Sequence, residues 1–410
     1  MLFTARMRSE TSGQERLENI GMHVRSLIIL ASLVVARITF GYQFQTIASL
    51  AAALMDQFGL TYTALGSLIG SYMILGVFTA LPLGLLGRRF GEGRVLTGGL
   101  LLMTGGACLS AFAFTATGIG IGRATAGFGA VAMIVLQNKI IAEWFRGRMF
   151  MIAISATVCA FPVGMGLAGL ILPPVVSAFG LHAALFTCAL PAGLAALLFG
   201  LSYREPSQHT AIPRCFSLPT TRECLLLAVA GLTWMAYTAG FSGFVSYLPT
   251  TLNLRGYGEA FVGLVLAIAM WGNAVGTLSG GGFALRIGQF PLFLLGTISL
   301  VAGMVGLTAT TWLITSAFVM GVLGSLQPGV VMAAATLSAK HENRAVGMGI
   351  FYTIYYAGGA LVPTLCGMAA DYADAPTGGL WAGAGLSLAA IPTFLLHRLI
   401  SARQSMLVKA

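Results

Sequence analysis

The sequence predicts an all-α integral membrane protein whose twelve transmembrane helices form two bundles of six. Two features of the composition support this fold class. Of 410 residues, 57% are hydrophobic and 8% are charged, whereas a soluble domain carries about 25% charged residues. Such a chain cannot cover a surface that faces water, so lipid must be its main solvent. The six cysteines are scattered without paired spacing, which favours apolar packing over disulfides or a metal site.

Apolar segments of suitable length recur along the whole chain. A helix needs about 20 residues to cross about 30 Å of hydrocarbon. Lipid offers no partners to backbone N–H and C=O groups, so each crossing must be helical. The expected segments, in order, are 27–50, 64–86, 95–114, 117–141, 149–172, 183–203, 223–248, 260–283, 291–309, 312–337, 346–368 and 379–398.

Basic residues distinguish the two ends of these segments. Lys and Arg occur in the N-terminal tail, in the loops at 87–94 and 143–148, and at later alternate loops, whereas the other loops carry a single one, Arg255. The positive-inside rule then predicts that both termini are cytoplasmic. The net charge of +10 is spread over short loops. It therefore does not indicate a nucleic-acid-binding surface.

The chain is expected to divide into two bundles at its longest loop, which contains three prolines. The expected parts are a cytoplasmic tail (1–25), an N-terminal bundle (26–203), a cytoplasmic loop (204–222), a C-terminal bundle (223–398) and a cytoplasmic tail (399–410).

Matched landmarks indicate that the second bundle repeats the first. Parallel repeats of six helices are typical of a two-lobed transporter with its site between the lobes. Three glycine pairs are separated by 197 residues and one arginine pair by 196: Gly66 and Gly263, Gly91 and Gly288, Gly127 and Gly324, and Arg148 and Arg344.

Two arginines interrupt the apolar segments, Arg37 in segment one and Arg123 in segment four. An arginine at the bilayer centre costs about 2.5–3.5 kcal/mol on insertion scales, so it normally has a partner. All twelve acidic residues fall in tails, loops or helix ends. We therefore predict that the missing counter-charge is a small anionic substrate, because a guanidinium binds oxyanions bidentately. For Arg123, the alternative is a structural role on helix carbonyls.

Several stretches resemble the major facilitator superfamily. GLLGRRFG (84–91) resembles the first-loop motif of that family, with Arg88 where the motif usually has aspartate, and GRATAGFG (122–129) resembles its arginine–glycine motif. RITFGYQ (37–43), QNKIIAEWF (137–145) and FYTIYY (351–356) are similar to the cyanate permease and nitroimidazole transporter group. The resemblance implies lobes that rock around a central site. The residues expected to serve this movement are Gly84, Arg88, Arg89, Gly91, Gly127, Arg148 and Arg344. For the arginines, the alternative is positive-inside anchoring.

Helical periodicity and the repeat suggest further substrate-binding residues. Gln45 lies on the same helical face as Arg37, and the repeat offset maps Arg37 onto Trp234. Aromatic residues elsewhere could line the same cavity, although each could instead pack between helices. The mid-segment amides Asn273 and Gln327 could bind a ligand or another helix. Lys139 is expected to extend to the headgroups, and the alternative is that it attracts ions at the inner mouth. The predicted substrate-binding set is Arg37, Gln45, Arg123, Trp234, Tyr237, Tyr352 and Tyr355.

The predicted function is secondary or facilitative transport of a small inorganic or organic anion by alternating access. Exchange or uptake is favoured, because no buried acid offers a site for proton coupling. The alternative is an efflux porter for drugs or other lipophilic compounds. Enzymatic motifs are absent from the sequence. We expect a monomer in a bacterial inner membrane type of bilayer, with no cofactor, no metal and no nucleic-acid partner.

Overall fold

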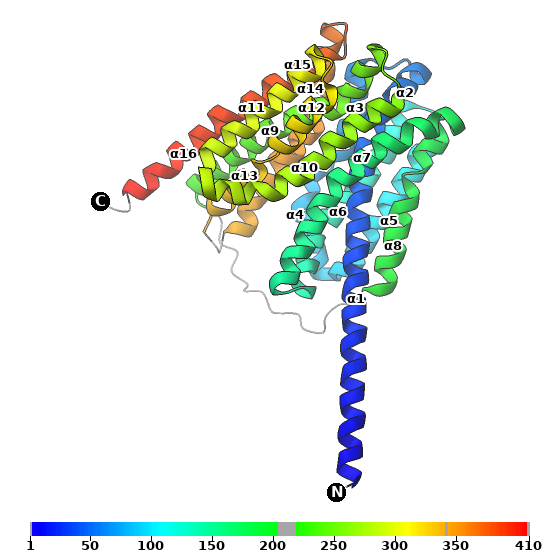
Figure 1. The fold of residues 1–410 in the computed structure, drawn as a ribbon, viewed down its shortest axis with the longest axis vertical. Coiled ribbons are helices and arrows are strands. Elements are labelled where there is room, and N and C mark those ends of the chain that lie inside the picture. Colours follow the sequence, from blue (N-terminus) through cyan, green and yellow to red (C-terminus); the bar gives the residue numbers. More distant parts are fainter. Residues whose placement is uncertain (1, 204–218, 341–342, 408–410) are drawn as a thin grey trace.

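The computed structural model describes residues 2–203, 219–340 and 343–407, which form helices and connecting turns without a strand (Figure 1). The first bundle comprises α1 (Leu2–Ser49), α2 (Ala51–Phe58), α3 (Tyr62–Ile74), α4 (Gly76–Phe90), α5 (Glu92–Ala111), α6 (Ala116–Trp144), α7 (Gly147–Phe186) and α8 (Ala189–Ser202). The second comprises α9 (Thr221–Leu254), α10 (Glu259–Ile287), α11 (Gln289–Ala309), α12 (Leu313–Phe318), the π-helix η1 (Val319–Leu323), α13 (Pro328–Leu337), α14 (Arg344–Tyr372), α15 (Thr377–Leu388) and α16 (Ala390–Leu407).

The predicted fold class is confirmed. Eleven helical stretches of the described chain are long and apolar enough to cross a membrane. The longest, Gly147–Ser202, holds two crossings, because the chain turns at Gly180, whose φ of 82° and ψ of 174° are not helical. Only glycine adopts such a conformation without strain. The hydrophobic segments therefore amount to twelve crossings.

Several crossings are less regular than the apolar segments indicated. The segment predicted at 64–86 is interrupted at Leu75, between α3 and α4. The one predicted at 312–337 contains η1 followed by turns before Pro328. Beyond the crossings, α1 begins at Leu2 and α16 continues to Leu407, so helix extends into both predicted tails.

The internal repeat appears in the backbone. Gly91, between α4 and α5, has φ 94° and ψ 135°, and Gly288, between α10 and α11, has φ 91° and ψ 157°. Both glycines donate a backbone N–H to the carbonyl four residues earlier, that of Gly87 or Ala284. The same turn therefore ends the corresponding helix of each bundle.

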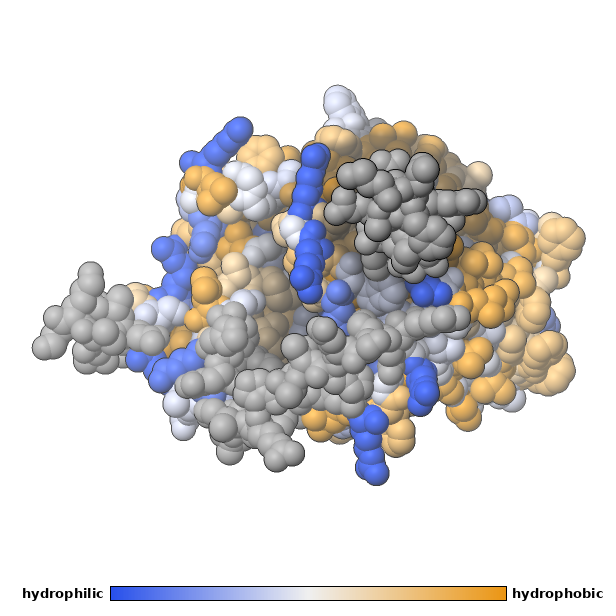
Figure 2. Space-filling model, turned by 90° about the horizontal axis from the view of Figure 1, so that it is seen from below, coloured by the Kyte–Doolittle hydropathy of each residue, from blue (hydrophilic) through white to orange (hydrophobic). Residues whose placement is uncertain are grey.

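The two ends of the molecule differ in charge. The basic end carries the N-terminal part of α1, the turns after α4, α6 and α10 and the C-terminal ends of α8 and α13. The far end carries the turns after α2, α5, α9, α11 and α14. Viewed from below, hydrophilic residues are distributed over the basic end between hydrophobic flanks (Figure 2). The exceptional Arg255 at the far end donates to the carbonyls of Leu307 (2.8 Å) and Thr310 (3.0 Å). It thus caps the C-terminus of α11.

Toward the far end, the bundles approach through glycines. A Cβ atom on Gly70 of α3 would lie 2.0 Å from the Ala360 oxygen of α14. In the repeat-related helix pair, a Cβ on Gly263 of α10 would lie 2.4 Å from the Gly169 oxygen of α7. Small residues permit such backbone contact, which is how helices associate where lipid supplies no hydrophobic driving force.

A carboxylate also joins the bundles at the far end. Asp371, at the end of α14, accepts hydrogen bonds from the backbone N–H groups of Tyr62 and Thr63, both at 2.9 Å, and from the Thr63 hydroxyl at 2.5 Å. These groups form the first turn of α3, so an acid of the second bundle satisfies donors that a helix N-terminus leaves unpaired.

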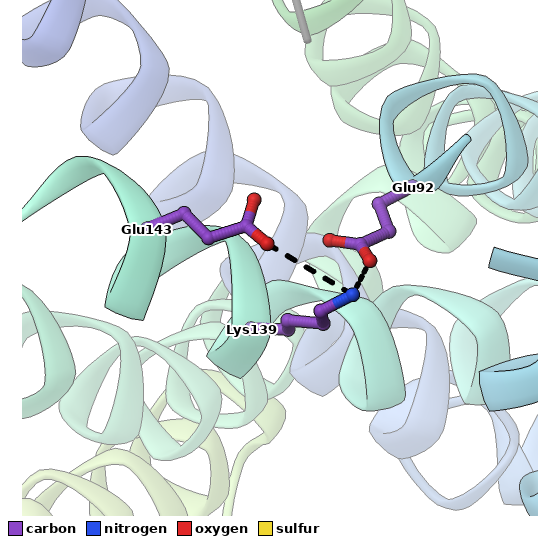
Figure 3. A network of polar contacts seen from close by, with 3 residues as sticks. All are labelled: Glu92, Lys139 and Glu143. Carbon is purple, nitrogen blue, oxygen red and sulfur yellow. Dashed lines mark ion pairs between the residues drawn. The ribbon is translucent and has the colours of Figure 1, made fainter. Parts of the chain in front are cut away.

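Charged residues of the basic end are also paired within the first bundle. Lys139 of α6 forms an ion pair with Glu92 of α5 and lies 3.9 Å from Glu143 (Figure 3). The expectation that Lys139 only extends to the headgroups therefore misses two carboxylate partners. Arg89 and Arg148 are exposed. Gly84 lies within α4, and the side chains of Arg88 and Arg344 lie outside the described part of the structure.

We expect Gly70→Ala to lower the thermal stability of the protein, because the new methyl group meets a backbone oxygen that cannot move alone. Overpacking of this kind costs about 1–3 kcal/mol. Gly98→Ala is the control, since a Cβ there meets nothing within 4 Å and alanine favours helix by up to about 1 kcal/mol. The measurement is the melting midpoint in detergent. Equal midpoints for the two variants would contradict the close contact.

Candidate substrate cavity between the bundles

A cavity of about 350 Å³ lies between the two bundles. Its lining comes from α1, α3, α6 and α7 on one side and from α9, α10, α13 and α14 on the other. None of the described lining residues is Asp, Glu, His or Lys. The polar and aromatic members used below are Arg37, Gln137, Asn138, Phe161, Trp234, Tyr237, Ser242, Asn273, Thr277, Phe351, Tyr352 and Tyr355.

Arg37 provides the only formal charge among the described lining residues. Its guanidinium carbon lies 5.1 Å from the ring centre of Phe40 and 5.5 Å from that of Phe161. Such cation–π contacts stabilise a desolvated guanidinium by about 2 kcal/mol. No hydrogen bond or ion pair joins it to another described residue, and its buried Nε has no partner. Arg37 therefore presents unused donors to the cavity.

Trp234 of α9 stands at the repeat-related position and lines the same cavity. Its ring makes edge contacts with Tyr237 (6.0 Å), Phe351 (5.8 Å) and Tyr355 (6.4 Å between ring centres). These contacts fix the indole, yet its buried Nε1–H has no hydrogen-bond partner. An indole nitrogen is a donor only. Trp234 therefore carries a second unused donor, in a residue that lines the cavity from the second bundle.

The predicted tyrosines Tyr237, Tyr352 and Tyr355 all line this cavity. Tyr352 and Tyr355 are close enough to Arg37 to interact electrostatically with its guanidinium. The structure therefore brings Arg37, Trp234 and these three tyrosines together from opposite bundles. Their part in substrate binding stays a prediction.

Sequence reasoning did not select some of the lining residues. Gln137 of α6 is 3% exposed and its Oε1 lacks a partner, and the neighbouring Asn138 also lines the cavity. The ring of Phe161 stacks on Phe40 with 4.7 Å between centres. The sequence could have singled out Gln137, because it is a glutamine within an apolar segment. It could not have singled out Phe161, because the chain has many aromatic residues in such segments.

Arg123 lies elsewhere. It is 4% exposed and donates to three carbonyls, those of Leu68 (2.7 Å), Gln43 (2.9 Å) and Ile69 (3.2 Å). It also lies over the Tyr72 ring, at 5.1 Å. It is not among the residues that line the central cavity. This geometry matches the structural alternative, and a part for Arg123 in substrate binding stays a prediction.

Gln45 is also absent from the cavity lining. It is fully buried and donates to the Val245 carbonyl of α9 at 2.9 Å. Of the two amides left open, Asn273 lines the cavity and donates to the Ser325 hydroxyl at 2.8 Å, whereas the buried Gln327 accepts from Thr297 at 2.9 Å. Gln45 therefore bridges helices, and Gln327 bonds within its own bundle.

Two six-helix bundles around a central cavity, all within an apolar chain, define a multi-pass membrane transporter of small molecules. A model of the Major Facilitator Superfamily matches residues 33–307 and 240–405. The chain belongs to this superfamily, which is not enzymatic. The superfamily resemblance drawn from residues 84–91 and 122–129 is thereby confirmed.

Characterised and uncharacterised transporters resemble the chain at moderate identity. A putative metabolite transport protein of Haemophilus influenzae is 27% identical over 352 residues, which is 80% of this chain and 85% of that protein. A 4-hydroxybenzoate transporter of Pseudomonas putida is 29% identical over 136 residues, which is 33% of this chain and 30% of that protein.

Solved structures show the same fold at low identity. The xylose transporter of Escherichia coli in an inward-open conformation aligns with a TM-score of 0.73 and 16% identity, covering 90% of this chain and 96% of that one. A bacterial homologue of the human lysosomal transporter Spinster, inward-facing and occupied, aligns with a TM-score of 0.69 and 15% identity, covering 91% and 96%.

We expect Arg123→Gln to destabilise the protein far more than Arg37→Gln. Losing Arg123 removes three charge-assisted hydrogen bonds in a buried site, each worth about 1.5–3 kcal/mol, and leaves three carbonyls without that donor. Arg37→Gln removes a buried charge that has no polar partner, so it should change stability by about 1 kcal/mol in either direction. Melting midpoints without ligand test this. A larger drop for Arg37→Gln would contradict the assignment.

Proposed function

We propose that this protein transports a small organic anion, most simply a carboxylate on an aromatic or otherwise apolar body, with Arg37 as its counter-charge. The observation that carries the proposal is a guanidinium at the cavity wall, with a buried Nε, that has aromatic neighbours but no carboxylate or carbonyl partner among the described residues. An arginine in that state provides in-plane donors to a carboxylate.

The remaining lining supports the apolar part of this substrate. Phe161, Trp234, Phe351 and three tyrosines line the cavity together with Arg37. Aromatic faces bind flat apolar groups through offset and edge contacts. The similarity to a 4-hydroxybenzoate transporter over part of the chain points to the same chemistry. The likeness of residues 37–43, 137–145 and 351–356 to the cyanate permease and nitroimidazole transporter group stays a prediction.

Alternating access is the mechanism we infer. The bundles corresponding to residues 26–203 and 223–398 meet through α3 and α14 and through α7 and α10 toward the far end. With the basic end cytoplasmic, as the positive-inside rule predicts, this arrangement is closed to the outside. Movement of the bundles would then expose the cavity to each side in turn. We propose that a monomer suffices, and that transport proceeds as exchange or uptake, since none of the described residues that line the cavity is an acid that could carry a proton.

The second candidate is efflux of lipophilic compounds. Four methionines, Met73, Met165, Met270 and Met332, line the cavity together with the aromatic rings. Flexible thioethers adapt to ligands of several shapes. This lining suits apolar compounds, but it does not account for the unpaired Arg37.

The test is a thermal-shift panel of benzoate, 4-hydroxybenzoate, small inorganic anions and lipophilic cations. A ligand at 100 times its Kd stabilises the native state by about 2.7 kcal/mol, so an aromatic carboxylate should raise the midpoint of the wild type clearly. Arg37→Gln should abolish that shift. Arg398→Gln is the matched control, because Arg398 also stands over a phenylalanine, 5.1 Å from the Phe290 ring centre, but does not line the cavity.

Proteoliposomes with the wild type or Arg398→Gln should take up radiolabelled benzoate, and those with Arg37→Gln should not. If lipophilic cations raise the midpoint of both the wild type and Arg37→Gln while carboxylates do nothing, the anion proposal is wrong and the efflux candidate replaces it.

A further inference from the structure

Buried polar atoms without a hydrogen-bond partner concentrate on two helices that belong to different bundles. Eight such atoms among the described residues lie on α1 and α9, and the others are scattered. Elsewhere on α9, hydroxyls bond one turn back, as Thr233 does to Val229 and Thr251 to Tyr247. The eight atoms belong to Arg37, Gln45, Ser49, Trp234, Ser242, Ser246, Thr250 and Asn253.

The unpartnered atoms of α9 share one face of the helix. Ser242, Ser246 and Thr250 are spaced by four residues, and Asn253 follows three residues later. On α1, Gln45 and Ser49 are likewise one turn apart. Residues three and four apart lie along one side of a helix. The two helices therefore each present a polar stripe.

These stripes face each other between two cavities. Ser242 lines the central cavity together with Arg37. Ser49, Thr250 and Asn253 line a smaller cavity of about 40 Å³ toward the far end, a volume sufficient for a few water molecules. Between the cavities, Gln45 donates to the Val245 carbonyl at 2.9 Å, and both Gln45 and Ser246 are fully buried. We call the contact between the two polar stripes the seam. One hydrogen bond therefore joins the two helices where the seam is fully buried.

Burying an unpartnered polar atom is unfavourable. A row of such atoms therefore indicates a second conformation in which they have hydrogen-bond partners. Water or a hydrogen-bonding ligand would satisfy all of them if α1 and α9 separated. The stretch between Arg37 and the smaller cavity carries hydroxyls and amides but no charge, and Glu259 is the carboxylate at the outer lining. This lining suits the passage of a hydrated or hydrogen-bonding solute.

We propose that the seam between α1 and α9 is the far-end route of the substrate, and that the Gln45–Val245 contact is its gate. This inference rests on the proposed alternating-access transport, and it gives Gln45 a role that differs from direct substrate binding. When the gate opens, Gln45 and Ser246 lie in a hydrated path that joins the two cavities.

Cysteine accessibility tests the route. Ser246→Cys and Thr251→Cys are each placed in the full chain with its six native cysteines replaced by alanine, after the melting midpoint of that background has been shown to match that of the wild type. Both positions are buried, at 0% and 2% exposure. They differ in that the Ser246 hydroxyl lies on the seam and the Thr251 hydroxyl is bonded to its own helix. A small anionic methanethiosulfonate reagent then probes both thiols.

We expect Ser246→Cys to react at least tenfold faster than Thr251→Cys, because opening of the seam exposes only the first. Adding Gln45→Ala, which removes the gate hydrogen bond, should raise the Ser246→Cys rate at least fivefold and leave the Thr251→Cys rate unchanged. Benzoate should change the Ser246→Cys rate alone.

Equal rates at the two positions would overturn the proposal, since they would report general loosening of α9. If the Ser246→Cys thiol does not react with the reagent in a protein that still transports benzoate, the proposal is overturned as well. If Ser246→Cys reacts and responds to Gln45→Ala while no anion binds, the route stands and the anion proposal fails, so the two failures are distinguishable.

Discussion

A positive charge without a counter-charge, held in the middle of an apolar bundle, is the constraint on which the central cavity depends. Arg37 and Arg123 pose the same electrostatic problem in the same bundle, and the structure solves it in two ways. Arg123 uses three helix carbonyls, whereas Arg37 has two phenylalanine rings. Rings stabilise the cation without using its N–H donors, so Arg37 keeps its donors for an anion, whereas Arg123 has committed three of its five.

The contact between the bundles is close but weakly polar. Glycines on α3 and α10 allow backbone approach, and the hydrogen bonds across the far end come from a few groups such as Asp371, Gln45 and Tyr247. In lipid, packing and a small number of hydrogen bonds replace the hydrophobic effect as the force between helices. Such an interface is specific and still separable, which a transporter with two open states requires.

The crossings were predictable because lipid imposes one rule on every segment. The repeat was predictable because its glycines recur in register, one pair of them, Gly91 and Gly288, in a turn that other residues avoid. The breaks at Leu75 and in η1 were not predictable, since mean hydropathy carries no information on hydrogen-bond register. The pair of Lys139 and Glu92 was missed for a related reason. Periodicity defines a helical face but not the neighbour that this face meets. For this reason it could not show that Gln45 bonds to α9 and does not line the cavity.

The unpartnered atoms of α1 and α9 show why sequence and a single structure are complementary here. In the sequence, Ser246 and Thr250 resemble every other hydroxyl that bonds to its own helix. In a closed bundle they differ, because their oxygen atoms lie buried without a donor or acceptor. A protein with one functional state would lose little by replacing them with alanine. A protein that alternates between states must leave some polar groups unsatisfied in each, since groups that contact water or substrate in one state are buried in the other.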